Sequence, residues 1–185
     1  HEIRFMPKPS GHIPQDGLHA LAKLSASCEL PFEQSRAMPP EVYTSSGFLE
    51  MEQRSIFGQE WQCLGRASAL AKTGDYLTAD INGQPVAVVR HGDGSLRAMS
   101  NVCMHRMAVL LEGRGNTRAI VCPYHAWTYT LDGDLRGAPM MAEQPGFCKD
   151  SYKLPQVRCE VWKGWIYVSL DPNATPVAER LVELD

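Results

Sequence analysis

The sequence lacks any long apolar run and any large excess of charge of one sign. No stretch approaches the roughly 20 consecutive apolar residues that a membrane-spanning helix needs, and no signal-peptide pattern is visible. The net charge at pH 7 is only −3, which gives no indication of a nucleic-acid or anionic-membrane partner. We therefore expect a cytoplasmic protein that binds neither nucleic acid nor membrane.

Cysteine is too scattered for a disulfide framework. Two of the six cysteines, Cys103 and Cys122, stand next to histidines in a recognisable motif. The other four show no framework spacing and are expected to be free thiols in a reducing compartment: Cys28, Cys63, Cys148 and Cys159. With 185 residues and 44% apolar content, the chain can bury one good core, and two small ones only at a stretch.

The most informative feature is a pair of short motifs, Cys103-x-His105 and Cys122-x-x-His125, separated by sixteen residues. In an extended segment, residues i and i+2 point to the same side about 6–7 Å apart, so Cys103 and His105 can each address a different iron of one cluster. Two thiolates and two imidazoles suit a Rieske [2Fe–2S] cluster, in which two His replace two Cys on one iron. The motif thus predicts an electron-transfer centre.

A structural zinc ion held by the same four residues is the alternative. Zinc fingers usually space each ligand pair by two to five residues, and the one-residue gap between Cys103 and His105 is tight for chelating a single ion. The spacing therefore favours the cluster. Analysis of iron and acid-labile sulfide distinguishes the two metals, because a zinc site holds no sulfide.

The residues around the ligands carry more information than the spacing alone. Four stretches resemble the Rieske domain of ring-hydroxylating oxygenase α subunits: Asn101–Arg106, Val121–Tyr129, Leu131–Leu135 and Gly137–Pro139. Upstream, the first helix of those subunits is resembled by Tyr43, Phe48, Glu52, Ile56, Phe57 and Trp61. Downstream, Gly164–Asp171 resembles their closing strand, so the likeness covers about residues 40 to 185.

This resemblance implies a function in electron transfer. In the family, a reductase or ferredoxin passes electrons to the cluster, which relays them to a mononuclear non-haem Fe(II) in a C-terminal oxygenase domain, often within a homotrimer. The resemblance also implies that Cys103 and Cys122 hold the buried iron and that His105 and His125 hold the outer one. Members are dioxygenases or monooxygenases that oxidise aromatic rings, as in aromatic hydrocarbon catabolism, or quaternary amines.

The Fe(II) site itself is not expected in this chain. Such a site uses two His and a carboxylate, and the remaining histidines have no pair at short helical spacing: His1, His12, His19 and His91. The chain alone is therefore expected to transfer electrons without oxygenating a substrate. A stand-alone Rieske ferredoxin, which is a carrier and not part of an enzyme, is the second alternative besides the zinc module.

Six further residues are expected to surround the cluster or to face a partner: Met104, Arg106, Met107, Tyr124, Trp127 and Pro139. The family often has Arg and Gly in place of Met104 and Met107. If that Gly serves a positive φ, Met107 must carry strain or lie in a different loop.

The cluster is expected to have a low potential for its type. Respiratory Rieske proteins have an extra disulfide between the two loops and a serine hydroxyl that donates to a cluster sulfur. This chain has Ala108 and Tyr124 at the disulfide positions and Trp127 at the serine position. Fewer donors stabilise the reduced form less, which predicts a potential of about −150 mV.

The proline-rich residues 1–42 are expected to form an extended arm with one or two helical turns between Leu18 and Leu24. Residues 43–60 are expected to form an amphipathic helix that is capped by Thr44 or Ser45 and ended by Gly58. Its apolar face would consist of Leu49, Ile56 and Phe57.

Residues 61–170 are expected to form the Rieske domain, a mainly β fold. Short β-type runs alternate with hairpin turns at Asn82-Gly83, Gly92-Asp93-Gly94, Asp132-Gly133 and Lys163-Gly164. This pattern predicts a small antiparallel β-barrel or sandwich that carries the two cluster-binding loops at hairpin ends. Residues 171–185 are expected to begin the connection to an absent catalytic domain, in a helix with Val177 and Leu181 on one face.

Overall fold

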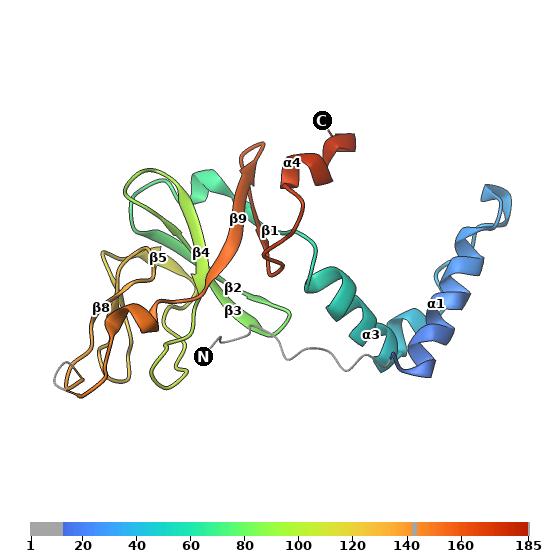
Figure 1. Cartoon of the computed structure of the whole chain (residues 1–185). Helices are drawn as coiled ribbons and strands as arrows, with labels where there is room; N and C mark the ends of the chain where they lie inside the picture. The colour runs from blue at the N-terminus through green and yellow to red at the C-terminus, as the bar shows by residue number, and fades with distance from the viewer. Residues whose placement is uncertain (1–12, 142–143, 185) are drawn as a thin grey trace. The chain divides into compact units, whose positions relative to one another are not determined.

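A computed structural model describes residues 13–141 and 144–184 of the chain. The chain divides into two compact units, with the boundary between Gln59 and Glu60. The first unit is helical and the second consists mainly of antiparallel strands (Figure 1). The predicted mainly β fold class with preceding helices is thereby confirmed. His1 and His12 lie outside the described residues, in which no helix is long and apolar enough to cross a membrane.

The first unit contains helices α1 (Gln15–Cys28), η1 (Phe32–Gln34), α2 (Glu41–Thr44) and α3 (Ser46–Glu52), followed by the π-helical turn η2 (Gln53–Phe57). Helix α1 is longer than the predicted Leu18–Leu24 run, so residues 13–41 are not a largely extended arm. Packing of α1 against another helix of the unit adds stability that the sequence pattern does not show. A Cβ atom added to Gly17 of α1 would lie 2.5 Å from the carbonyl carbon of Gly47 in α3, so the two helices cross in close contact.

The start of α3 agrees with the sequence. The Ser45 hydroxyl accepts a hydrogen bond from Phe48 N at 3.0 Å, which is the predicted cap. Asp16 of α1 strengthens it, because its carboxylate accepts from Ser45 Oγ at 2.7 Å and from Gly47 N at 3.1 Å. The helical run ends at Gly58 as predicted. Its expected apolar face is exposed in the described structure: Leu49, Ile56 and Phe57.

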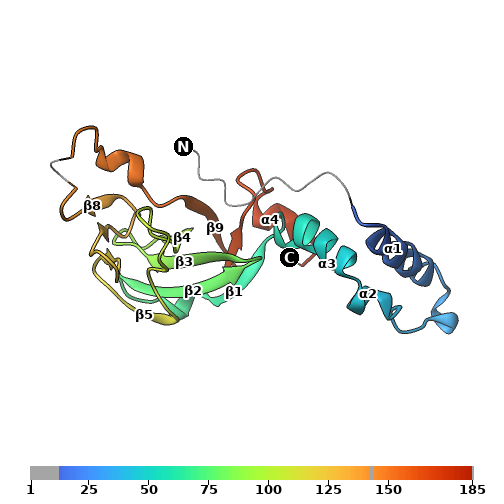
Figure 2. The same cartoon turned by 90° about the horizontal axis from the view of Figure 1, so that it is seen from below.

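The second unit contains a seven-stranded antiparallel sheet in the order β1-β10-β9-β4-β3-β2-β5 and a three-stranded sheet in the order β6-β7-β8 (Figure 2). The large sheet comprises β1 (Gln62–Arg66), β2 (Asp75–Ile81), β3 (Gln84–Arg90), β4 (Leu96–Ser100), β5 (Arg114–Asn116), β9 (Gln156–Trp162) and β10 (Trp165–Ser169). The small sheet comprises β6 (Ile120–Val121), β7 (Thr128–Tyr129) and β8 (Leu135–Gly137). Short helices complete the unit: η3 (Ala67–Ala69), η4 (Lys149–Tyr152), α4 (Val177–Arg180) and η5 (Val182–Leu184).

The predicted hairpin turns are confirmed. Asn82-Gly83 joins β2 to β3 with φ values of 53° and 76°, and Lys163-Gly164 joins β9 to β10 with 46° and 80°. Two successive residues at positive φ match the right-handed twist of the flanking strands, which is why Asn-Gly and related pairs predict such hairpins. Gly94 and Gly133 also have positive φ, in the turns after β3 and β7.

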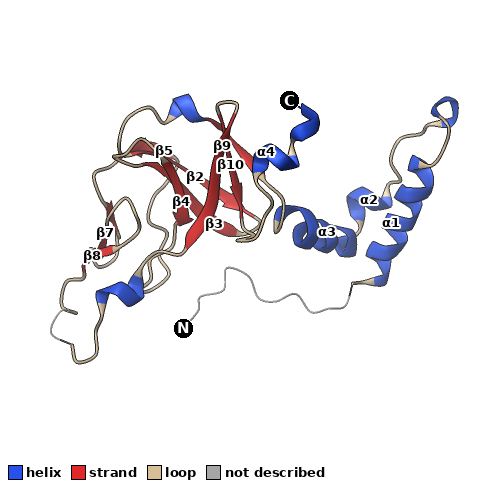
Figure 3. Cartoon of the chain, turned by 45° about the horizontal axis from the view of Figure 1, so that its top comes forward, coloured by secondary structure: helices blue, strands red, loops and turns tan. Residues whose placement is uncertain are grey.

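Buried apolar residues form two clusters, which is the less favoured of the two arrangements that the length allows. One lies within the large sheet and includes Leu77, Val88 and Ile166. The other lies below the predicted metal-binding loops and includes Cys103 and Cys122. The second cluster combines residues of the small sheet, which is drawn apart from the large sheet in Figure 3, with Val89 and Met99 of the large sheet.

An ionic network connects the two sheets. His91, in the turn after β3, has Nε2 3.1 Å from Asp132 Oδ2 in the turn after β7. Arg97 of β4 pairs with the same Asp132 carboxylate and with Asp93 at 2.8 Å. His91 lies in a turn as predicted, and it also helps to hold the small sheet against the large one.

Residues after Asp171 are attached to the second unit. Trp61 Nε1 donates to the Thr175 carbonyl at 2.7 Å, and Arg180 pairs with Glu60 at 2.6 Å. Helix α4 is only four residues long. Of the predicted apolar face, Val177 is buried and Leu181 is half-buried.

Candidate metal centre

The first candidate loop is a tight turn that begins at Cys103. Cys103 N donates to the Ala108 carbonyl at 2.8 Å, and Met107 N donates to the Cys103 carbonyl at 3.0 Å. These two bonds fold the backbone so that the Cys103 side chain lies inside, fully buried, and Arg106 and Met107 lie outside. The loop can therefore present a ligand inward and a surface outward.

The second loop repeats the first. Cys122 N donates to the Trp127 carbonyl at 2.8 Å, and Ala126 N donates to the Cys122 carbonyl at 3.1 Å. In each loop the cysteine bonds to the residues four and five positions later. The fourth residue has a positive φ in both, 56° at Met107 and 54° at Ala126. Met107 thus has a positive φ and carries the strain, which is one of the two alternatives that the sequence left open, and the matching φ at Ala126 was not foreseen.

A positive φ in a residue with a Cβ costs roughly 1–2 kcal/mol. We expect Met107→Gly to raise the free energy of unfolding of the metal-free domain by about 0.5–1 kcal/mol, because the removed strain exceeds the entropy that glycine adds to the unfolded chain. Chemical denaturation measures the change. The control is Ala108→Gly, at the next position, where φ is not positive. This control should destabilise the domain, and a Met107→Gly variant that is equally destabilised would contradict the strain.

The two thiols lie side by side in an apolar setting. Cys103 is fully buried and Cys122 is 2% exposed. Burial raises the pKa of the Cys122 thiol, and the neighbouring Cys103 thiol raises it further. Buried thiols of this kind are inert unless a positive charge stabilises the thiolate. A bound metal supplies such a charge.

The two imidazoles form the second pair. Their ring centroids are 4.9 Å apart, with His105 half-buried and His125 exposed. Burial, and to a smaller extent the charges of His125 and Arg106, lower the pKa of His105, which favours the neutral form that a metal ligand needs. His105 Nδ1 is buried and has no hydrogen-bond partner within the described part of the chain. A buried ring nitrogen without a partner is costly, and a bond to a metal would satisfy it.

These donors fit a Rieske cluster. The loops bring the four predicted ligands together as a thiol pair and an imidazole pair, which is the set that a [2Fe–2S] centre with two His on one iron requires. Within residues 13–141 and 144–184, no group of three or more His, Cys, Asp or Glu side chains is close enough to hold a metal ion, so the fit rests on the thiol pair and the imidazole pair.

Tyr129 is a functional candidate that the sequence did not single out. Its buried hydroxyl lies 3.4 Å from Cys103 Sγ and accepts a hydrogen bond from Met104 N at 3.1 Å. Because the Met104 amide already donates to the Tyr129 oxygen, the hydroxyl hydrogen of Tyr129 can point toward the Cys103 sulfur. Burial, together with the neighbouring Cys103, raises the pKa of Tyr129, so the hydroxyl remains a donor at neutral pH.

We expect Tyr129→Phe to lower the potential of the bound cluster by about 40 mV, because a hydrogen bond to a ligand sulfur, worth about 1 kcal/mol, favours the more negative reduced form. Protein-film voltammetry measures the shift. The control is Tyr124→Phe, which removes an exposed hydroxyl from the second candidate loop, just before β7. It should leave the potential unchanged. An unchanged potential in Tyr129→Phe would mean that the hydroxyl does not donate to Cys103.

The other expected neighbours occupy different environments. Trp127 is buried and stacks on His105, with ring centroids 4.7 Å apart and planes 7° apart. Met104 is half-buried and packs on the lower apolar cluster. Four of the six neighbours are exposed: Arg106, Met107, Tyr124 and Pro139. Of these, Tyr124 meets His125 edge-on, at 6.0 Å between centroids.

The chain matches one protein family and a group of curated relatives. Residues 60–158 match the Rieske [2Fe-2S] domain family. The carnitine monooxygenase oxygenase subunit of Escherichia coli K12 is 37% identical over 150 residues, which is 80% of this chain and 40% of that protein. The biphenyl 2,3-dioxygenase subunit alpha of Rhodococcus jostii is 34% identical over 157 residues, covering 84% of this chain and 34% of that protein.

Solved structures agree with these matches. The quaternary ammonium Rieske monooxygenase CntA in complex with an inhibitor superposes with a TM-score of 0.76 at 36% identity, covering 81% of this chain and 42% of that one. Naphthalene 1,2-dioxygenase from Rhodococcus sp. superposes with a TM-score of 0.78 at 27% identity, covering 95% and 39%. The chain thus spans about one third to two fifths of the length of these relatives.

Proposed function

This chain belongs to the Rieske [2Fe–2S] family as the Rieske domain of an oxygenase subunit, and we propose that it is the electron-accepting domain of such an enzyme. The observation that carries the proposal is the pairing of two buried thiols with two imidazoles, one of which has a buried nitrogen without a partner among the described residues. Four side chains would hold the group: Cys103 and Cys122 one iron, His105 and His125 the other. When bound, the cluster takes up and releases one electron at a time.

The protein's own residues set the conditions for that exchange. The two loops bury both cysteines and so keep water from the thiolates. Tyr129 holds its hydroxyl against Cys103. His125 is the exposed ligand, so its ring is the closest approach for an electron-transfer partner. Electrons would therefore cross the surface at His125.

We further propose the partners. The donor is a reductase or ferredoxin, and the acceptor is a mononuclear Fe(II) in a C-terminal oxygenase domain outside this chain, in a homotrimer. The exposed side chains beside the ligands support docking at this end, since Met107 and Tyr124 are 60% and 67% exposed and apolar in large part. Met104, Arg106 and Met107 are the candidates for that contact.

For substrates, we propose the two classes that the relatives' names include, aromatic rings and quaternary amines. The pocket that selects between them belongs, in this proposal, to the C-terminal domain. Identities of 37% and 34% to the two kinds of subunit are too close to favour one class.

Metal analysis of the purified chain tests the proposal. We expect about two iron and two acid-labile sulfide per chain, and a reduced form with the paramagnetic signal of a mixed-valence pair. Zinc without sulfide would replace the proposal with the structural zinc module. If the chain holds a cluster but its gene does not continue into an oxygenase domain, the protein would instead be a stand-alone ferredoxin.

A further inference from the structure

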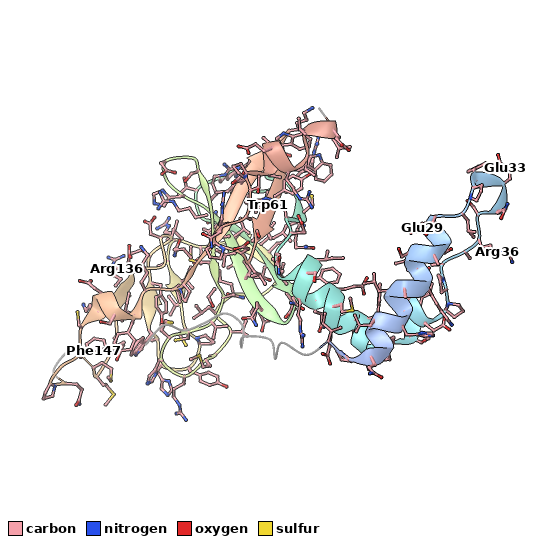
Figure 4. The ribbon with its side chains drawn as sticks, turned by 45° about the vertical axis from the view of Figure 1, so that its right-hand side comes forward. Glu29, Glu33, Arg36, Trp61, Arg136 and Phe147 are labelled. Atoms are coloured by element: carbon pink, nitrogen blue, oxygen red, sulfur yellow. The ribbon has the colours of Figure 1, made fainter. Side chains whose placement is uncertain are left out.

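One of the two imidazoles lies at the end of a chain of aromatic contacts. Trp127, only 1% exposed, stacks on His105 at 4.7 Å between ring centroids. On its other sides, Trp127 meets Phe147 at 5.8 Å and Tyr152 at 5.2 Å, both nearly perpendicular. Phe147 and Tyr152 stack on each other at 5.2 Å. Both come from the segment after β8 that ends in η4, where Figure 4 labels Phe147.

The other imidazole has no equivalent support. The ring contacts of His125 within the described residues are with His105 and Tyr124, and both are edge-on. His125 is also exposed, whereas His105 is half-buried. The two histidines are therefore alike in sequence but unequal in their surroundings.

We propose that Trp127, held in place by Phe147 and Tyr152, is a positioning residue that fixes the ring plane of His105 and shields one face of it from water. This rests on the proposed function, since it requires His105 to be a metal ligand. A metal bond leaves an imidazole free to turn about that bond, and proteins usually stop the rotation with a hydrogen bond to the ring. Here the stacked indole of Trp127 restricts the rotation of the His105 ring instead. His105 becomes the rigid ligand and His125 the adaptable one.

Residues that influence the metal centre then include two that act only through Trp127. In the described part of the chain, the ring contacts of Phe147 and Tyr152 are with Trp127 and with each other, yet a change in either alters the support of the indole. The segment between β8 and β9 is then coupled to the metal centre through one buried side chain. Packed aromatic rings transmit such changes because their contacts leave little free volume.

Nitrogen-selective electron–nuclear double resonance on the reduced domain tests the proposal. We expect two distinct ligand-nitrogen couplings in the wild-type domain. Trp127→Leu should shift and broaden one of them and leave the other in place, and Trp127→Phe should restore it because a ring is again present. Iron should also be lost to a chelator about 10- to 100-fold more readily in Trp127→Leu, the usual effect of removing a partner of a metal ligand.

Tyr152→Leu provides a second variant, at the half-buried far end of the aromatic contacts. It should shift the same nitrogen coupling to a smaller extent. The control is Trp162→Leu, which removes a tryptophan of β9 whose ring contacts are Tyr167 and Lys163, away from the ligands. Both couplings and the rate of iron loss should stay unchanged in this control.

The outcomes separate this proposal from the proposed function. A folded Trp127→Leu domain with both couplings and its iron retention unchanged would overturn the positioning role while leaving the cluster in place. If Trp127→Leu does not fold, Tyr152→Leu decides, and unchanged couplings there overturn the role equally. Zinc without sulfide in the wild-type chain refutes the proposed function, and the positioning role with it, before any variant is made.

Discussion

Replacing His125 by cysteine is expected to lower the potential of the domain from about −150 mV toward the roughly −400 mV of plant-type ferredoxins. The cause is electrostatic. A neutral imidazole becomes an anionic thiolate, so the oxidised centre already carries negative charge and the added electron is repelled. His125 is the better of the two imidazoles for this test, because it is exposed and its neighbours can adjust to a smaller side chain.

Voltammetry gives the potential of the His125→Cys domain, and the visible spectrum should move toward the all-cysteine type. Tyr124→Cys is the matched control, since it adds a thiol one residue away while all four ligands remain. Its potential should stay near that of the wild-type domain. A potential that is unchanged or higher in His125→Cys would show that His125 is not bound to the cluster.

Local signals in the sequence were sufficient for the hairpins and for the cap of α3. Asn82-Gly83 and Lys163-Gly164 adopt two successive positive φ values, which few other residue pairs do at low cost. Ser45 caps α3 through a bond to a residue only three positions away. Such features depend on near neighbours in the chain, and a sequence contains these directly.

Features that depend on distant residues could not be predicted in the same way. Helix α1 lies against α3 in a close contact that Gly17 and Gly47, thirty positions apart, permit. The role of Tyr129 depends on a sulfur 26 positions earlier. Neither contact has a periodicity or a spacing that marks it, so only the folded chain brings the partners together.

The ligands themselves lie between these cases. The pairs within each loop follow from short spacing, but the pairing of thiol with thiol and imidazole with imidazole is seen only in the folded chain. There the two loops repeat the same hydrogen bonds and the same positive φ at the fourth residue after the cysteine, while the histidine is the second residue after it in one loop and the third in the other. The sequence raised this conformation as one of two alternatives at Met107 and gave no sign of it at Ala126. The site is thus two copies of one turn facing each other.

Electron transfer and oxygenation are expected to separate completely in this chain. Given dithionite or a compatible reductase, the purified domain should cycle its cluster reversibly. Given Fe²⁺, O₂ and a panel of aromatic and quaternary-amine substrates, it should form no hydroxylated or demethylated product. The reason is that a mononuclear Fe(II) oxygenase site needs two His and a carboxylate with open positions. Of the histidines that the structure describes outside the proposed ligands, His91 is engaged with Asp93 and Asp132, and His19 lies in the other unit.

Product analysis by mass spectrometry, with the cluster content of each sample measured in parallel, provides the test. Adding a separate C-terminal oxygenase domain should restore turnover when docking brings the two metal centres within electron-transfer distance. Arg106→Glu, a charge reversal on the exposed side of the first loop, should then reduce the restored rate and leave the reduction of the cluster by dithionite unchanged. Product formation by the chain alone, in a preparation free of other oxygenases, would refute the assignment as an electron-accepting domain only.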